Sequence, residues 1–240
     1  MSDWMELEIT LGLGSIVLGI LAGRLSTWVA CWLPAILEQQ WQRDARELLG
    51  LDLDEPCKLQ TAGSTVRGTW AAQIGCAVLS FVVTVHYGPT IQAFFALLFT
   101  WSLLALSLID SKHHMLPDAL IIPMLWIGLV LNSFGVFTTL HEALWGCAMG
   151  YLSLWSVFNI VKFITGIESL GAGDFKMLAL IGAWTGWQAL PWTVGCTLLL
   201  AALACGYLKL QKALASPSKI PLGPFLAMSG WAGLLLSHQW

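Results

Sequence analysis

Long apolar runs recur along this chain of 240 residues, and they constrain its fold more than any other feature. Charged residues make up only 10% of the sequence, less than half of the roughly 25% found in soluble domains. So few charged side chains cannot cover a normal water-exposed surface. The 14 Trp residues agree with this, because indole rings favour the interface between bilayer and water. The sequence therefore predicts an all-α, polytopic membrane protein.

Eight segments are apolar enough to be transmembrane helices, each of which needs about 20 mostly apolar residues. They are Ile9–Val29, Trp70–Tyr87, Ile91–Ile109, Ala119–Val136, Leu144–Phe163, Phe175–Ala189, Trp192–Leu210 and Pro221–Leu236. The one long polar segment, residues 34–69, predicts a small extramembrane subdomain. The chain is thus expected to divide into a first span (1–33), this subdomain (34–69) and a membrane core (70–240).

The 11 Lys and Arg residues all lie at or near the odd-numbered connections between these segments. The even-numbered connections (88–90, 137–143 and 190–191) and both ends of the chain contain none. Cytoplasmic loops collect Lys and Arg, so the odd-numbered connections are predicted to face the cytoplasm. The formal net charge of −3 argues against a nucleic-acid partner, which leaves membrane lipid as the expected surrounding partner.

Three acidic residues lie beside apolar segments, where ionisable groups are costly and are candidates for function. Asp110 ends the third segment, Asp118 precedes the fourth and Asp174 precedes the sixth. Asp118 and Asp174 come directly before predicted helices, so each has the alternative role of a helix cap. Asp110 has no such role, because a carboxylate at a helix C-terminus opposes the helix dipole.

Asp110 and Asp174 are predicted to lie on the same, cytoplasmic side and could meet there. Gly171 and Gly173, just ahead of Asp174, permit positive φ angles and the close approach of another backbone. Two converging carboxylates suit an aspartic protease, in which one takes a proton from water and the other, protonated, hydrogen-bonds the scissile carbonyl. The same pair would also serve a small ion-coupled transporter. Because both acids lie at one membrane face, the protease is favoured.

Other candidate residues point to no metal site. His113 and His114 are adjacent, so they cannot easily reach one metal ion, and a solvated loop is expected. The six cysteines are scattered singly without a CxxC motif, which predicts neither a disulfide framework nor a zinc site.

Three blocks of this sequence form a distinctive set: Asp110–Asn132, Glu168–Trp187 and Ile220–Trp231. In the first block, Asp110 stands eight residues before the end of an LPD triplet, Leu116-Pro117-Asp118. The second contains Gly171-Ala-Gly-Asp174-Phe-Lys176. With these blocks the sequence resembles the type IV prepilin peptidases, which are membrane aspartic proteases of the GxGD class, and the third block is similar to the C-terminal block of that family.

This resemblance implies eight spans in the bacterial inner membrane, with Asp110 and Asp174 as catalytic residues that face the cytoplasm. It implies supporting roles for Gly171, Gly173, Lys176, Pro117 and Asp118, with Lys176 facing lipid headgroups or tuning the pair. The implied substrates are type IV prepilins or the pseudopilins of type II secretion, cut after the glycine that ends a short basic leader. Many members then N-methylate the new N-terminus with S-adenosylmethionine, whereas the peptidase reaction needs no cofactor.

The N-terminal third departs from the family pattern. Where the family usually reads GSFLNVVIYRLP, the chain has residues 23–34 with Thr27 at the asparagine position and Trp32 at the arginine position. The paired CxxC motifs of the first cytoplasmic loop are missing, and only Cys57 lies there. Four thiolates would close a tetrahedral zinc site, so no zinc is expected. These departures bear most on the methyltransferase activity.

Overall fold

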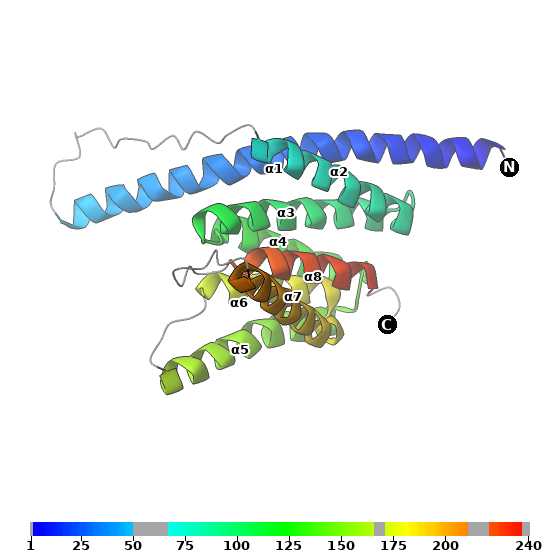
Figure 1. Cartoon of the computed structure of the whole chain (residues 1–240). Coiled ribbons are helices and arrows are strands. Elements are labelled where there is room, and N and C mark those ends of the chain that lie inside the picture. The colour runs from blue at the N-terminus through cyan, green and yellow to red at the C-terminus, as the bar shows by residue number, and fades with distance from the viewer. Residues whose placement is uncertain (1, 50–66, 166–170, 211–220, 237–240) are drawn as a thin grey trace.

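The computed structural model describes residues 2–49, 67–165, 171–210 and 221–236, and within these ranges the chain is helical with no strand. The prediction of an all-α fold is confirmed, and one α-helix occupies each of the eight predicted segments. Figure 1 shows the helices stacked side by side along roughly one direction. The elements are α1 (Ser2–Leu48), α2 (Arg67–Tyr87), α3 (Ile91–His113), α4 (Asp118–Ser133), α5 (Leu140–Thr165), α6 (Ala172–Thr185), the 3-10 helix η1 (Trp187–Ala189), α7 (Leu190–Leu210) and α8 (Gly223–Leu236).

Five segments of the described structure are long and apolar enough to cross a membrane: those in α1, α2, α3, α5 and the continuous stretch of η1 with α7. The apolar helices α4 and α8 are shorter, with 16 and 14 residues, and α6 also has 14. This pattern is that of a polytopic membrane protein, as predicted. That all eight helices cross the membrane stays a prediction, because the length criterion supports five.

Helix α1 is much longer than the predicted first span, Ile9–Val29. It continues through Pro34 to Leu48, which makes it 47 residues long. At 1.5 Å per residue it is about 70 Å in length, so it extends well past one bilayer. The residues after Pro34 are mostly Gln, Glu, Arg, Ala and Leu, which are good helix formers. The polar segment 34–69 therefore begins inside a helix, and its residues 50–66 lie outside the described ranges, so the division into domains is still a prediction.

The predicted sixth span, Phe175–Ala189, is interrupted. Helix α6 ends at Thr185, and Gly186 with φ of 82° turns the chain into η1. A glycine with φ of 67° at position 135 likewise places the end of α4 before the predicted end at Val136. Positive φ angles strain residues that have a Cβ atom, so these two glycines determine where the helices stop.

Helix α6 is the centre of the bundle. Most of its side chains are fully buried, among them Met177, Leu178, Ile181 and Trp184. The Trp184 indole donates a hydrogen bond to the Met124 carbonyl of α4 at 2.8 Å and packs against Phe99 of α3. Helix α6 is short and packs against α4, α5 and α8 (Figure 1), so its neighbours on several sides hold it in place.

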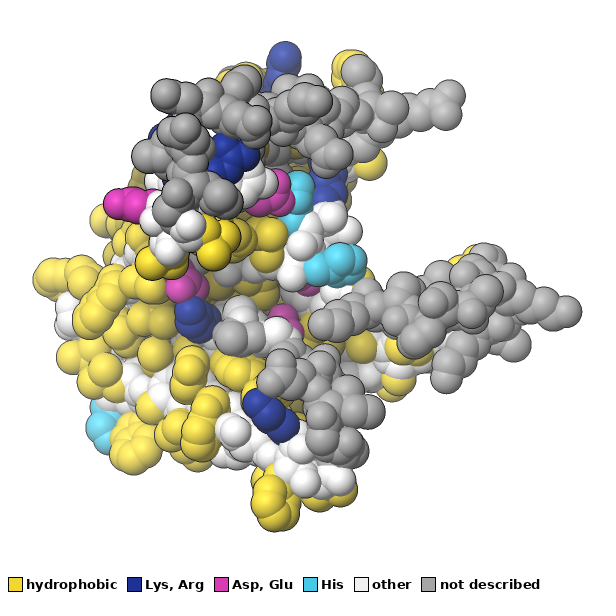
Figure 2. Space-filling model, turned by 90° about the vertical axis from the view of Figure 1, so that its left-hand side faces the viewer, with side chains coloured by type: hydrophobic (Ala, Val, Ile, Leu, Met, Phe, Trp, Pro, Cys, Tyr) yellow, Lys and Arg dark blue, Asp and Glu magenta, His cyan; other side chains and the backbone are white. Residues whose placement is uncertain are grey.

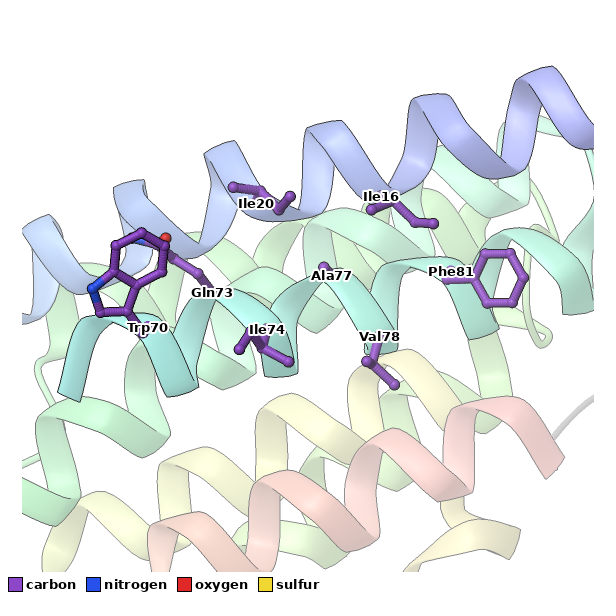
Figure 3. Close-up of a pocket in the computed structure, with 8 residues that line it drawn as sticks. All are labelled: Ile16, Ile20, Trp70, Gln73, Ile74, Ala77, Val78 and Phe81. Atoms are coloured by element: carbon purple, nitrogen blue, oxygen red, sulfur yellow. The ribbon is translucent and has the colours of Figure 1, made fainter. Parts of the chain in front are cut away.

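Helices α1 and α2 pack closely together beside α3. A Cβ atom on Gly19 would lie 2.7 Å from the Cα of Ala77, and one on Gly23 would lie 2.8 Å from the Cα of Gln73. Such small residues let helix backbones approach within a membrane. Between the two helices lies a groove of about 310 Å³ (Figure 3), whose lining is apolar apart from Gln73.

Candidate active site

Asp110 lies in the last turn of α3, and its side chain is buried, with a relative exposure of 6%. Its Oδ2 atom accepts a hydrogen bond of 2.8 Å from the backbone N–H of Gly223, the first residue of α8. The next turn of the chain is sharp, because His114 adopts a left-handed conformation with φ of 51°. The end of α3 and the start of α8 therefore meet at one end of the bundle.

Asp174 is the third residue of α6 and is also buried, with a relative exposure of 8%. Its Oδ2 atom accepts a hydrogen bond of 3.3 Å from the backbone N–H of Gly171, which precedes the helix. A capping role, the alternative considered from the sequence, is thus present, although Asp174 lies inside the helix and not ahead of it. Gly171 has φ of −81°, so it does not use the positive φ that a glycine permits.

The structure brings the Asp110 and Asp174 carboxyl groups close enough to interact electrostatically at one end of the bundle. Burial, and secondarily the neighbouring Asp110 carboxylate, raise the pKa of Asp174 to about 6, and the hydrogen bond from Gly171 opposes this rise. Asp174 precedes the apolar part of α6, at the end of the bundle. Two like charges so placed do not ionise together easily, which favours a state in which the pair shares one proton.

Gly173 allows the loop between α3 and α4 to pack against the first turn of α6. A Cβ atom at position 173 would lie 2.6 Å from the Cβ of Leu116, so a larger residue would push this loop away. The close approach expected of Gly173 is therefore observed. Pro117, also in this loop, is the N-cap of α4, and its carbonyl accepts hydrogen bonds from Leu120 and Ile121.

The alternative role of Asp118, as the N-cap of α4, is not the one that the structure shows. Pro117 occupies the N-cap position, and Asp118 is the first residue of the helix. Both oxygens of its carboxylate accept hydrogen bonds of 2.7 Å from the Lys176 ammonium. The observed partner of Lys176 is therefore Asp118. The expected roles of Lys176, at lipid headgroups or in tuning the Asp110–Asp174 pair (the dyad), stay predictions. The ion pair links the Leu-Pro-Asp loop to Lys176 on α6, and Lys176 lies two residues after Asp174.

Reversal of the charges of this pair tests its contribution to stability. Because the two side chains are 51% and 35% exposed, the contribution is expected to be at most about 1 kcal/mol. Asp118→Lys and Lys176→Asp should each lower the thermal unfolding temperature in detergent, and the double variant should recover most of the loss. Added salt should shrink these differences. A double variant no more stable than the worse single variant would contradict the proposed link.

Around the dyad, polar side chains connect α3 to α1. The His113 Nδ1 lies 3.9 Å from the Glu38 Oε1, and the Lys112 Nζ lies 3.9 Å from the Cys31 Sγ. Figure 2 views this end of the molecule and shows charged and histidine side chains gathered across it, beside an apolar flank. Among the described residues no group of three His, Cys, Asp or Glu side chains could hold a metal ion. Cys57 lies outside the described ranges, so the absence of zinc stays a prediction.

Gly223 and Leu116 are parts of the site that sequence reasoning did not identify. Gly223 lies in the third motif block, but it contributes a backbone N–H, and a backbone donor has no side-chain signature. Leu116 could be recognised from the sequence only as the first residue of the Leu-Pro-Asp triplet. The one available signal in the sequence was position: Gly223 lies near the start of the predicted span Pro221–Leu236, and Leu116 lies just before the predicted span Ala119–Val136.

Comparisons with known proteins point in one direction. A family model described as the type IV leader peptidase family matches residues 97–208. A protein of Pseudomonas putida named prepilin leader peptidase/N-methyltransferase is 41% identical over 93% of this chain and 90% of its own length. A protein of the same name from Stutzerimonas stutzeri is 39% identical over 94% of this chain and 90% of its own length. No solved structure matches the chain.

Proposed function

The chain belongs to the type IV leader peptidase family, and from this premise we propose that it is a membrane aspartic endopeptidase. Its proposed substrates are type IV prepilins or type II secretion pseudopilins, cut after the glycine that ends the leader. The names of the related proteins support this substrate class. The observation that carries the proposal is the coupled pair of buried carboxyl groups, Asp110 and Asp174, each held by a backbone N–H.

The pair can perform peptide hydrolysis without a metal. One carboxylate takes a proton from a water molecule while the water oxygen forms a bond to the scissile carbonyl carbon. The other carboxyl group, which is protonated, gives its proton to the carbonyl oxygen and stabilises the tetrahedral intermediate. The C–N bond then breaks, the amine leaves with the proton taken from water, and the second carboxyl group recovers its own proton. The net reaction consumes one water molecule.

An ion-coupled transporter that uses the same carboxylates is not favoured. Both acids lie at one end of the helices, and α6, which carries Asp174, has only 14 residues. A transport route needs polar groups in the membrane interior as well as at its edge. The related proteins are named as peptidases.

The proposed location is the bacterial inner membrane, with the dyad facing the cytoplasm. Lys112 and Lys176 lie at the same end of the bundle as the dyad, where the rule for cytoplasmic loops expects basic residues. Membrane lipid is the proposed partner for the remaining surface. The apolar groove between α1 and α2 (Figure 3) suits an acyl chain, since Gln73 is its only polar lining residue.

N-methylation of the new N-terminus is proposed from the names of the related proteins, and it would require S-adenosylmethionine. In the departing block of α1, the Thr27 hydroxyl donates to the Arg24 carbonyl at 2.8 Å, and Trp28 and Trp32 stack with ring centroids 5.1 Å apart. Both contacts lie within α1.

Co-expression with a prepilin, followed by mass spectrometry of the product, tests both activities. We expect a shortened product that begins after the leader glycine. With S-adenosylmethionine added to purified components, we expect one extra methyl group on that N-terminus, and chelators should leave cleavage intact. A preparation that cleaves fully and adds no methyl group would show a peptidase only. Absence of cleavage for every prepilin tested would refute the proposed function.

A further inference from the structure

The first turn of α8 has a single backbone donor available to a partner outside the helix. Phe225 and Leu226 both donate to the Leu222 carbonyl, at 3.1 Å. Pro224 has no N–H. The remaining N–H, that of Gly223, donates to Asp110 Oδ2 at 2.8 Å. The first N–H groups of a helix have no partner within the helix and carry its positive dipole end, so this contact favours a negatively charged Asp110.

Gly223 also fits tightly against the carboxyl group that it binds. A Cβ atom at position 223 would lie 2.6 Å from Asp110 Oδ2 and 2.9 Å from its Cγ. Any other residue would displace either the carboxylate or the start of α8. A glycine is therefore required at this contact by the closeness of the approach.

The two carboxyl groups of the dyad are not held in the same way. Asp110 accepts a hydrogen bond of 2.8 Å from the end of another helix, whereas Asp174 accepts one of 3.3 Å from its own preceding turn. His114, just after the end of α3, also interacts electrostatically with Asp110. Lys176, on α6, is paired with Asp118 of α4.

The other charged groups near this end of the bundle leave the difference between Asp110 and Asp174 in place. On α3, His113 faces Glu38 of α1, and Lys112 faces Cys31. Helix α8 carries no ionisable side chain. Asp174 is thus the acidic group that faces Asp110 from α6, and Gly223 is the donor that faces it from α8.

We propose that Gly223 is a positioning residue that holds Asp110 as the ionised member of the dyad, so that Asp174 carries the shared proton. This assignment rests on the proposed peptidase function. Asp110 then takes the proton from the attacking water, and Asp174 gives its proton to the carbonyl oxygen. When the C–N bond breaks, Asp110 passes its proton to the leaving amine, and Asp174 regains its own from the tetrahedral intermediate.

Labelling with a hydrophobic carbodiimide tests the assignment without any substrate, because this reagent attacks protonated carboxyl groups. The wild-type protein in detergent would be labelled over a range of pH, and each aspartate would be quantified by peptide mass spectrometry. We expect Asp174 to react up to a higher pH than Asp110. The reverse order would overturn the proposal, and this readout is unaffected by the identity of the substrate.

Variants at position 223 test the role of the N–H group. Gly223→Pro removes the donor, at a helix position where the proline backbone is well tolerated, and like alanine it also adds a Cβ atom against the carboxylate. Gly223→Ala keeps the donor but forces the carboxylate away. Both variants are expected to move the acid limb of the pH–activity profile up by about one pH unit, because a carboxylate that loses a hydrogen bond to its charged form binds its proton more tightly. In both, labelling of Asp110 should extend to higher pH.

Gly230→Ala is the matched control on the same helix. A Cβ atom there would lie 2.6 Å from Ile181 Cδ1, so it also crowds the core, but it is far from the carboxylates along α8. This variant should lower stability and leave the pH profile and the labelling order unchanged. If the Gly223 variants behave like Gly230→Ala, Gly223 has only a packing role. If a Gly223 variant fails to fold, replacement of the residue 222–223 amide by an ester removes the same donor without added bulk, and labelling gives the answer.

Failure of this proposal is distinguishable from failure of the proposed function. A wild-type protein that cleaves prepilin but labels first at Asp110 refutes the assignment alone. A wild-type protein that labels as expected but cleaves no prepilin refutes the function alone.

Discussion

Asp110→Asn and Asp174→Asn are each expected to lower the rate of prepilin cleavage at least about a hundred-fold, because an amide can neither take a proton from water nor donate one as an acid. Asparagine has nearly the same shape as aspartate, and its carbonyl oxygen can still accept the hydrogen bond from Gly223 or from Gly171. The loss should therefore be chemical and not structural. Initial rates with purified enzyme and prepilin in detergent measure it.

Asp118→Asn is the matched control for these two variants. Asp118 lies in the same polar end of the bundle but is half-exposed and paired with Lys176. Its substitution should cost no more than the ion pair and leave cleavage within several-fold of the wild-type rate. All three variants should show the same helical circular dichroism. An inactive Asp118→Asn together with an active Asp110→Asn would show that the dyad is wrongly assigned.

Gly182→Leu is expected to remove most of the folded protein. Helices α5 and α6 meet at Gly146 and Gly182, and a Cβ atom on either glycine would collide with the carbonyl oxygen of the other. Backbone atoms on both sides leave no flexible side chain to give way, so the cost should reach about 3 kcal/mol or more. The separation of α5 from α6 would also displace Asp174. Yield, thermal unfolding temperature and activity per folded molecule would be measured.

Gly195→Leu provides the comparison, because position 195 on α7 has no heavy atom within 4 Å of where a Cβ atom would lie. The same substitution there should leave stability and activity close to those of the wild type. If Gly182→Leu is as stable as Gly195→Leu, the close contact between α5 and α6 does not exist in the protein.

The relation between Asp110 and Asp174 could be anticipated from sequence because it depends on rules that act along the chain. Apolar segments determine which residues are helical, and the distribution of Lys and Arg assigns each connection to one side. These two rules already place both aspartates at the same end. The three motif blocks were also recognisable, since they are contiguous in sequence, and the similarity to named peptidases agrees with them.

Helix ends were predicted less well, for local physical reasons. Helix α5 starts at Leu140 and α3 ends at His113, and both positions lie beyond the apolar residues that defined the predicted spans. Hydropathy reports where a helix meets lipid, whereas backbone hydrogen bonding continues into polar residues. The continuation of α1 to Leu48 is the largest example, because after Pro34 the residues up to Leu48 include no glycine or proline that would stop a helix.

The sequence by itself determined the all-α membrane fold and the approximate placement of the helices. It also singled out Asp110 and Asp174, two acids that stand beside apolar segments. Only the tertiary structure decided what each acid touches. Asp118 pairs with Lys176, which lies 58 positions away, and Asp110 binds the N–H of Gly223, which lies 113 positions away. The physical reason is that these contacts depend on how helices dock in three dimensions, and a backbone N–H is the same in every residue except proline. Sequence patterns report the periodicity of one segment, and they carry no record of which helix end faces another.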